Sequence, residues 1–120
     1  MSYKPRYFSP YEFERIGCHM EDVNEESLRR LDRARAAAGI PFVLTSAYRT
    51  VAHELEMGRS GYSAHTRGRA FDISCQSDLF RHKIVQAAMQ VGFCRIGIAK
   101  NFVHIDDDVE HLPWPRIWLY

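Results

Sequence analysis

The sequence predicts an α+β fold in which one small, mostly antiparallel sheet is flanked by helices. Segments with helical periodicity and short segments with strand-like alternation are mixed along the chain, without the regular strand–helix–strand repeat of a parallel sheet. The last two strand-like segments flank a Lys-Asn turn and have the spacing of an antiparallel hairpin. A chain of 120 residues supports one hydrophobic core and is too short for two, so we expect a single domain over residues 1–120.

Capping residues and the helical spacing of apolar side chains predict four helices. The most regular one has an asparagine cap, acidic residues in its first turn and a glycine after its last turn. A second long helix starts at a serine or aspartate and stops at a glycine, and a short one begins with a serine followed by proline. The predicted helices cover residues 9–17, 24–39, 50–57 and 77–92.

Four short apolar segments predict strands, and two of them alternate apolar and polar residues, as strands with one buried face do. Residues 58–69, rich in Gly, Ser and Arg, predict a loop. The tail, 111–120, holds two Trp and two Pro, and we expect an extended or irregular segment laid over the core. The predicted strands cover residues 41–48, 70–74, 93–99 and 102–106.

Composition and charge argue against several classes of protein. Sixteen basic and fifteen acidic residues give a formal net charge of +1, which provides no reason to expect nucleic acid or an anionic membrane as a partner. The arginine-rich stretch 29–35 is interleaved with acids and predicts a solvated helix face. No apolar run approaches the roughly 20 residues that span a bilayer, and the first residues lack a secretory pattern. We therefore expect a soluble protein made in the cytoplasm without its own export signal. We also expect it to be a monomer.

The three cysteines show no C-x-x-C spacing, which argues against a disulfide framework and against a cysteine zinc site. Cys75 and Cys94 lie within apolar stretches. We predict that both are buried free thiols.

Two of the predicted strands present polar residues that converge if the strands are neighbours in one sheet. Side chains two positions apart share a face, so Asp72 lies on the polar face of its strand and His104 shares a polar face with Asp106. His65 would arrive from the preceding loop. Two imidazoles and one carboxylate form a common catalytic zinc site, with a fourth position left for water. The alternative is ordinary hydrogen-bonding residues, because six histidines in the chain make chance pairings easy.

The stretch from Ser63 to Asp72 fits S-x-H-x-x-G-x-A-x-D, the signature of the zinc D-alanyl-D-alanine peptidase family, which belongs with hedgehog-like and lysostaphin-like domains in one superfamily. Upstream, LTSAYRT resembles the family's Ser-Gly-Tyr-Arg strand end, with Ala47 in place of the usual glycine. Downstream, FVHID resembles the family's Phe-Val-His-Val-Asp strand, and the opening YFSPYEFERIGC is similar to the small phage- and bacterium-encoded branch. The resemblance covers roughly residues 7–108.

This resemblance implies a zinc peptidase that cuts D-amino-acid-containing peptides of bacterial peptidoglycan, either as a D,D-carboxypeptidase or as an endolysin-like enzyme. Carried over residue by residue, His65, Asp72 and His104 would bind Zn²⁺. Arg49 would bind the substrate carbonyl and stabilise the oxyanion, and Ser63 would hold the substrate or the motif loop. Such an enzyme would act on the cell wall when delivered by a phage or released.

The general base departs from the family pattern. Many members place Glu or Asp three residues before the last histidine ligand, but here that residue is Asn101, which cannot take a proton from water. Asp106 would serve either as the base or as a hydrogen-bond partner that orients a histidine ligand. His111 is a further candidate, because the lysostaphin-like relatives use a histidine near their zinc.

The remaining charged and aromatic residues carry weaker expectations. Exposed positions are expected for the tail acids Asp107, Asp108 and Glu110. His53 and Glu54 lie four to five residues after Arg49, so two places are open to them: the cleft wall or, as the favoured prediction, a solvated helix face. Candidates for cleft walls are Tyr48, Tyr62, Trp114 and Trp118, with core or covering roles equally open for the two Trp.

Two alternative functions stay open at this point. The first is a non-catalytic zinc-binding module on the same scaffold, which Asn101 favours and Arg49 disfavours. The second is a phage particle component with a wall-degrading domain, in which the chemistry is unchanged and only the location differs.

Overall fold

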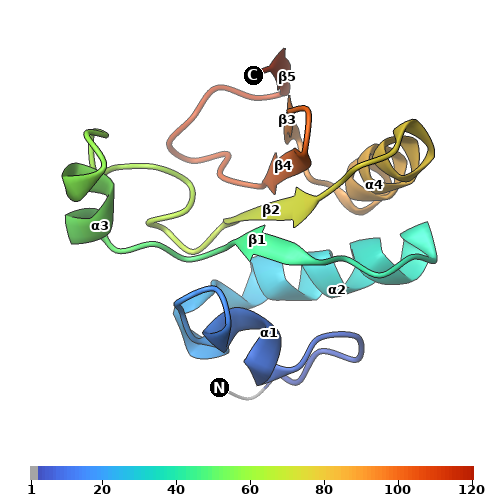
Figure 1. Cartoon of the computed structure of the whole chain (residues 1–120), viewed down its shortest axis with the longest axis horizontal. Helices are drawn as coiled ribbons and strands as arrows, with labels where there is room; N and C mark the ends of the chain where they lie inside the picture. The colour runs from blue at the N-terminus through green and yellow to red at the C-terminus, as the bar shows by residue number, and fades with distance from the viewer. Residues whose placement is uncertain (1–2) are drawn as a thin grey trace.

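The fold is built around a five-stranded sheet with the strand order β1-β2-β4-β3-β5 (Figure 1). The computed structural model describes residues 3–120. Neighbouring strands are antiparallel, except that β5 runs parallel to β3 at one edge. The predicted α+β class is confirmed, although the first strand is shorter than expected. The strands are β1 (Leu44–Ser46), β2 (Ala70–Ser74), β3 (Arg95–Ile98), β4 (Phe102–Asp106) and β5 (Arg116–Leu119).

The four predicted helices form, and their ends follow the capping residues. The side chain of Asn24 accepts a hydrogen bond from the backbone N–H of Ser27, and that of Ser77 accepts one from Phe80. Both long helices end at a glycine in the left-handed conformation, with φ of 68° and 102°. The helices are α1 (Pro10–Glu14), α2 (Glu25–Ala38), α3 (Val51–Glu56) and α4 (Asp78–Val91), with a 3-10 turn at Met20–Asp22.

One face of the sheet belongs to the hydrophobic core that it shares with α2 and α4. Because successive side chains on a strand point to opposite faces, burying the alternate apolar residues places Asp72 and His104 on the other face. The predicted alternation is therefore confirmed, and it leaves a polar row on the face away from the core. The fully buried residues that join in this core include Phe71, Ile73, Val103 and Ile105 from the sheet and Leu28, Leu31 and Ile84 from the helices.

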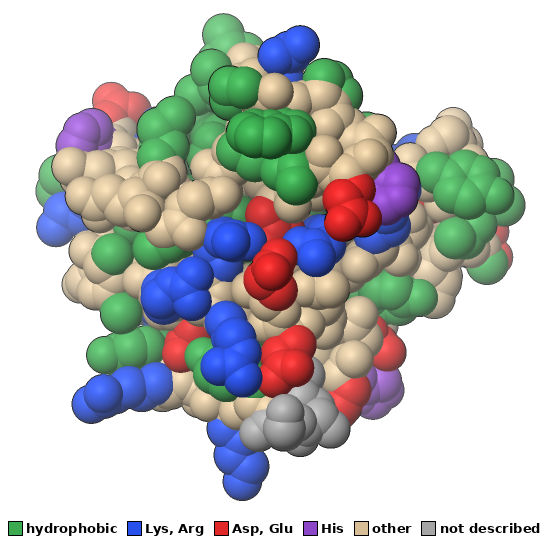
Figure 2. Space-filling view, turned by 180° about the vertical axis from the view of Figure 1, so that it is seen from behind, with side chains coloured by type: hydrophobic (Ala, Val, Ile, Leu, Met, Phe, Trp, Pro, Cys, Tyr) green, Lys and Arg blue, Asp and Glu red, His purple; other side chains and the backbone are tan. Residues whose placement is uncertain are grey.

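The C-terminal tail is more regular than predicted. Instead of lying irregularly over the core, part of it joins the sheet as β5, with Trp118 paired to Gly97. A Cβ on Gly97 would lie 2.7 Å from the rings of Trp118 and Tyr120, so a glycine is needed for these rings to lie against β3. Ile117 and Leu119 of β5 are exposed, and hydrophobic side chains gather at this end of the molecule, at the top of Figure 2.

The predicted solvated face of α2 holds only in part. Arg29 is exposed, but Asp32 is buried. Its carboxylate accepts hydrogen bonds of 2.8 Å from the Tyr3 hydroxyl and from the backbone N–H groups of Arg6 and Tyr7. The N-terminal segment is thereby tied to α2. Figure 2 shows Lys and Arg side chains interspersed with Asp and Glu rather than a surface of one sign.

The cysteines are free thiols, as predicted. Cys94 is only partly buried, contrary to expectation, because it lines a surface hollow beside β5. Within residues 3–120, no helix has both the length and the apolar character that crossing a membrane requires.

Replacing Gly97 by alanine should destabilise the protein by about 1–3 kcal/mol, because the added methyl group overpacks the contact with the two rings. Urea unfolding measures this free energy. The same change should be nearly neutral in a Trp118→Ala/Tyr120→Ala background, where the rings are gone. An equal cost in both backgrounds would contradict the steric explanation.

Candidate functional site

Three side chains converge on the polar face of the sheet. The antiparallel register of β2 and β4 pairs Asp72 with His104, and their Oδ1 and Nδ1 atoms lie 2.9 Å apart. His65, from the loop before β2, places its Nε2 3.5 Å from Oδ2 of Asp72. One ligand atom from each of the three residues lies within 4.8 Å of the others. The structure therefore brings together all three predicted metal ligands.

The loop that carries His65 is fixed by backbone contacts. Gly68 has a φ of 72°, and a Cβ there would lie 2.8 Å from the carbonyl oxygen of Asp22, so a side chain has no room. The carbonyl of Gly68 accepts a hydrogen bond from the N–H of Asn24, at the start of α2. On the other side, Nδ1 of His65 lies 2.7 Å from the carbonyl oxygen of the buried Ala47.

The outer nitrogens of both rings face hydrogen-bond acceptors. Nδ1–H of His65 donates to the Ala47 carbonyl, which leaves Nε2 as the lone-pair nitrogen facing Asp72. Nε2–H of His104 donates to Oδ2 of Asp106 at 2.6 Å, which leaves Nδ1 facing Asp72. Metal-binding histidines characteristically donate their other N–H to a carbonyl or a carboxylate. Both rings thus have the environment of a ligand.

The donor set and its spacing fit zinc. Bond lengths of about 2.0–2.2 Å to nitrogen and oxygen imply neighbouring ligand atoms roughly 3.3 Å apart in a tetrahedral site. Oδ1 of Asp72 lies 2.9 Å from Nδ1 of His104 and Oδ2 lies 3.5 Å from Nε2 of His65, which is close to that spacing, and one ligand atom from each of the three residues lies within 4.8 Å of the others. Two lone-pair nitrogens and a carboxylate converging in this way need a positive charge between them. A divalent cation satisfies that requirement.

Protonation can supply this charge when no metal does. Burial raises the pKa of Asp72, but hydrogen bonds from His104 and His65 outweigh that effect and hold the pKa well below its usual range. Burial lowers the pKa of His104, but the carboxylates of Asp106 and Asp72 outweigh it and raise the pKa. Metal binding at these residues therefore competes with protons.

Arg49 reaches the same cleft from the end of β1. Its backbone N–H donates to the carbonyl of His65 at 3.4 Å, so the two residues are held side by side. Nε of Arg49 lies 3.3 Å from Oε1 of Glu54, yet it is buried without a well-formed hydrogen bond among the described residues. The side chain is about a quarter exposed, at 23%, and lines the cleft with the three candidate ligands.

Comparison with known proteins agrees with this geometry. The chain matches the model of the peptidase M15 family over residues 10–106, which is most of its length. The chain belongs to this family. The predicted resemblance to zinc D-alanyl-D-alanine peptidases is thereby confirmed. No curated protein and no solved structure matches the chain.

Asp106 lies behind His104, on the side of the ring away from Asp72. Its carboxylate is fully buried and is held by Nε of Arg95 at 3.0 Å and by the backbone N–H of Asp108 at 3.2 Å. Of its two predicted roles in this M15 peptidase, the contacts favour orientation of His104 over proton abstraction from water. Its role as a general base stays a prediction.

The two aspartates that follow are not exposed tail charges, contrary to prediction. Asp107 and Asp108 are 3% and 1% exposed. Each carboxylate is tolerated in a buried position because hydrogen-bond donors, arginines among them, surround it, and these partners come from α2, from the loop that carries His65 and from the tail. Asp107 binds Arg30, Arg69 and Ser27, whereas Asp108 binds Arg67 and His111. Glu110 is exposed, as predicted.

Glu54 lies in the cleft, which the sequence interpretation gave only as the less favoured of two alternatives. It was expected on a solvated helix face, but it is 1% exposed and lines the cleft. Its carboxylate contacts Arg49, accepts a hydrogen bond from Nη1 of Arg59 at 2.6 Å, and accepts another from the Ser63 hydroxyl at 3.3 Å. Burial raises the pKa of Glu54, but Arg59, Arg49 and Ser63 outweigh it and lower the pKa. The available signal was an acidic residue in α3 with an arginine five positions before it and another five positions after it.

Ser63 holds the motif loop rather than presenting a free hydroxyl. Besides its bond to Glu54, its Oγ accepts from the backbone N–H of Thr66, while the Thr66 hydroxyl donates to the Ser63 carbonyl. Of its two predicted roles, the contacts support holding the loop. Binding of substrate by Ser63 stays a prediction.

Aromatic side chains form one wall of a cleft of about 410 Å³ around the candidate ligands. The centroid of the Trp118 ring lies 5.4 Å from that of His104, and the wall continues through Tyr120 and Phe102, whose rings are in contact. Tyr62, from the loop after α3, also lines the cleft. Tyr62 and Trp118 therefore lie where cleft walls were expected. Trp114 is 54% exposed and lies outside the cleft.

Other predicted residues lie farther from the ligands. Asn101 is exposed at the β3–β4 turn, where its carbonyl accepts a hydrogen bond from the N–H of Cys75. His111 is half exposed and binds Asp108. Tyr48 and His53 line a neighbouring hollow that shares Arg49 with the cleft.

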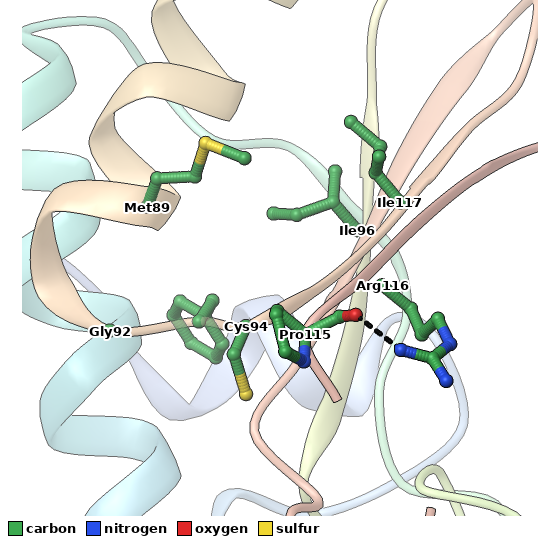
Figure 3. Close-up of a pocket in the computed structure, with 8 residues that line it drawn as sticks. Met89, Gly92, Cys94, Ile96, Pro115, Arg116 and Ile117 are labelled. Carbon is green, nitrogen blue, oxygen red and sulfur yellow. Dashed lines mark hydrogen bonds between the residues drawn. The ribbon is translucent and has the colours of Figure 1, made fainter. Parts of the chain in front are cut away.

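A further hollow, of about 400 Å³, lies between α4 and strands β3 and β5. Figure 3 shows Met89 and Ile96 pointing into it from opposite sides. The Arg116 side chain turns away and donates a hydrogen bond to the carbonyl of the preceding residue, Pro115. Its lining is mainly apolar and offers no carboxylate or histidine. The side chains that could bind a metal or transfer a proton therefore lie in the cleft around His104 and not in this hollow.

Replacing Asp106 by asparagine should weaken zinc binding by about 10–100-fold, because the carboxylate that orients the His104 ring is lost. Competition with a chromophoric chelator measures the affinity. Asp107→Asn is the matched control: it breaks a neighbouring buried ion pair that does not touch a candidate ligand. It should lower stability and leave zinc affinity unchanged. Equal losses of affinity in both variants would refute a specific role for Asp106.

Asp108 should make stability depend on acid pH. Burial raises the pKa of its carboxyl, but His111 and Arg67 outweigh this and lower the pKa. A lowered folded-state pKa adds stability above the unfolded value of about 3.9, and that stability is lost as pH falls through the folded value. Asp108→Asn should therefore cost about 1–3 kcal/mol at pH 7 and progressively less below pH 4, as measured by urea unfolding. A cost independent of pH would contradict this.

Proposed function

We propose that this M15 peptidase is a zinc enzyme that hydrolyses peptide bonds in bacterial peptidoglycan, in stem peptides or their cross-links. The observation that carries the proposal is the convergence of His65, Asp72 and His104 in a cleft that also contains Arg49. The family match supports peptide hydrolysis. The choice of cell-wall substrate rests on the family's signature residues, and action at the wall after phage delivery or release is part of the proposal.

The ligands would hold Zn²⁺ through Nε2 of His65, a carboxylate oxygen of Asp72 and Nδ1 of His104. A zinc ion there supplies a Lewis acid and lowers the pKa of water that it binds toward about 7. Asp106 keeps the proton of His104 on Nε2, so that Nδ1 stays available. The Ala47 carbonyl does the same for His65.

Arg49 would receive the carbonyl oxygen of the scissile bond. Its guanidinium is in the cleft, and its buried Nε has no well-formed hydrogen bond among the described residues. Negative charge that develops on that oxygen during attack is stabilised by a fixed cation more than the ground state is. Glu54 holds this cation in place without neutralising the site, because it is shared with Arg59.

A non-catalytic zinc-binding module is the second candidate, and one observation favours it. The carboxylates lining the cleft are already engaged: Glu54 with arginines, Asp72 with histidines, and Asp106 with His104 and Arg95. With Asn101 at the position of the usual base, zinc binding without turnover is the expected behaviour of such a module.

Digestion of purified peptidoglycan by the zinc-loaded protein separates the two candidates, with released fragments identified by mass. The wild type should release peptides and His104→Ala should not. Arg49→Gln should lower kcat about 10²–10³-fold while zinc stays bound. Arg33→Gln, an exposed change on α2, is the control for loss of an arginine.

Binding of zinc with no cleavage by the wild type would favour the non-catalytic module, and equal cleavage by His104→Ala would refute the enzyme. Asp106→Asn, assayed at saturating zinc, tests the base. A near-normal rate leaves only the orienting role.

A further inference from the structure

Strand β5 forms an open edge of the sheet, at the top of the molecule in Figure 1. It pairs with β3 on one side, and no strand of the described chain lies on its other side. The backbone N–H groups of Arg116 and Tyr120 donate to carbonyls of β3. Because backbone groups alternate in direction along a strand, those of Ile117 and Leu119 point outward. Within residues 3–120 these outward groups have no hydrogen-bond partner.

The two edges of the sheet differ in how they are covered. At the β1 edge, the guanidinium of Arg15, next to α1, donates to the carbonyl of Leu44 at 3.0 Å. Nothing in the described part of the chain covers β5 in this way, and the side chains of Ile117 and Leu119 are 57% and 80% exposed. An exposed apolar edge strand is a template for pairing with a strand of another chain. The occupant that fits β5 is therefore a strand.

A second copy of the chain supplies a strand that matches this edge. In an antiparallel pair of β5 strands with Trp118 opposite its own copy, Ile117 lies across from Leu119 of the second copy. The outward backbone groups of these two residues then face each other, and a pair placed in this way exchanges both of its N–H···O bonds. The two exposed apolar side chains also meet across the strands and leave the solvent.

Charge favours this antiparallel register over a parallel one. Arg116 is the one charged residue of β5. In the antiparallel register it lies across from Tyr120 of the second copy, and the two arginines are roughly 13 Å apart along the strands. A parallel pair in register would set the two guanidinium groups directly opposite each other, and like charges in that position are destabilising.

We propose that this protein forms a two-fold symmetric dimer through β5, in which the two five-stranded sheets join into one continuous sheet. On one face, Leu119 of the second copy extends the apolar wall of the hollow that Met89 and Ile117 line. On the other face the Trp118 side chains of the two copies are neighbours, so both candidate clefts open on the same side of the joined sheet. The dimer does not depend on the proposed peptidase function.

Sedimentation velocity on the zinc-loaded protein, between about 1 and 500 µM, measures the association. The wild type should move from the monomer mass of 14.0 kDa to twice that mass, with a dissociation constant on the order of 10 µM for such a small interface. Ile117→Glu and Leu119→Lys should each weaken association about tenfold or more, because each dimer then buries two unpaired charges. Leu79→Lys is the matched control: this leucine of α4 is 62% exposed and lies outside β5, so the change should leave association unaltered.

The double variant Ile117→Glu/Leu119→Lys tests the register. The antiparallel pairing puts opposite charges across from each other in both pairs, so the double variant should associate about tenfold more tightly than either single variant. Parallel pairing in register would bring like charges together and give no recovery.

Three results would overturn the proposal. The first is a wild type that keeps the monomer mass at every concentration, as expected from the sequence alone, or that associates beyond two copies. The second is association that neither single variant weakens, and the third is a double variant that associates no better than the single variants. None of these results depends on whether the protein digests peptidoglycan.

Discussion

The antiparallel pairing of β2 with β4 is the constraint on which the site depends. It places Asp72 directly across from His104, where the side chains of a cross-strand pair are close enough to share one ion. The same register buries Phe71 and Ile105 against the helices. A slip of one residue would turn the whole polar row into the core, so the register that buries the apolar residues is also the one that assembles the candidate metal site. The site is therefore preorganised by the core and does not rely on mobile side chains.

The end of β4 ties the surrounding segments to this pair. Three successive aspartates point to different partners: Asp106 to His104 and Arg95, Asp107 to α2, and Asp108 to the loop that carries His65. Buried carboxylates are tolerated only when cations and donors surround them, so these partners cannot leave without a large cost. These contacts join the β3–β4 hairpin, α2 and the loop that carries His65. They meet next to the two histidines, which need fixed positions.

Local patterns in the sequence were enough to predict the three candidate ligands and most of the elements. Strand alternation and the spacing around His65 are local features, and local features can be recognised without knowing the fold. The burial of Asp107, Asp108 and Glu54 was not predictable in this way, because it depends on arginines that only the tertiary structure brings near. The pairing of β5 was missed for a similar reason. Nothing in the sequence shows that Gly97 is there to make room for the ring of Trp118, because only the tertiary structure brings the two residues together.

The contact between Trp118 and His104 gives the cleft a chromophore of its own. The ring centroids of the indole and the imidazole lie 5.4 Å apart. The guanidinium carbon of Arg95 lies 5.0 Å from the indole centroid. Indole emission is sensitive to nearby charge, and here its neighbours are His104, a candidate metal ligand, and Arg95, the cation that holds Asp106. The second indole, Trp114, is largely in solvent. The emission spectrum of the protein thus combines one tryptophan that reports on the site with one that reports on bulk water.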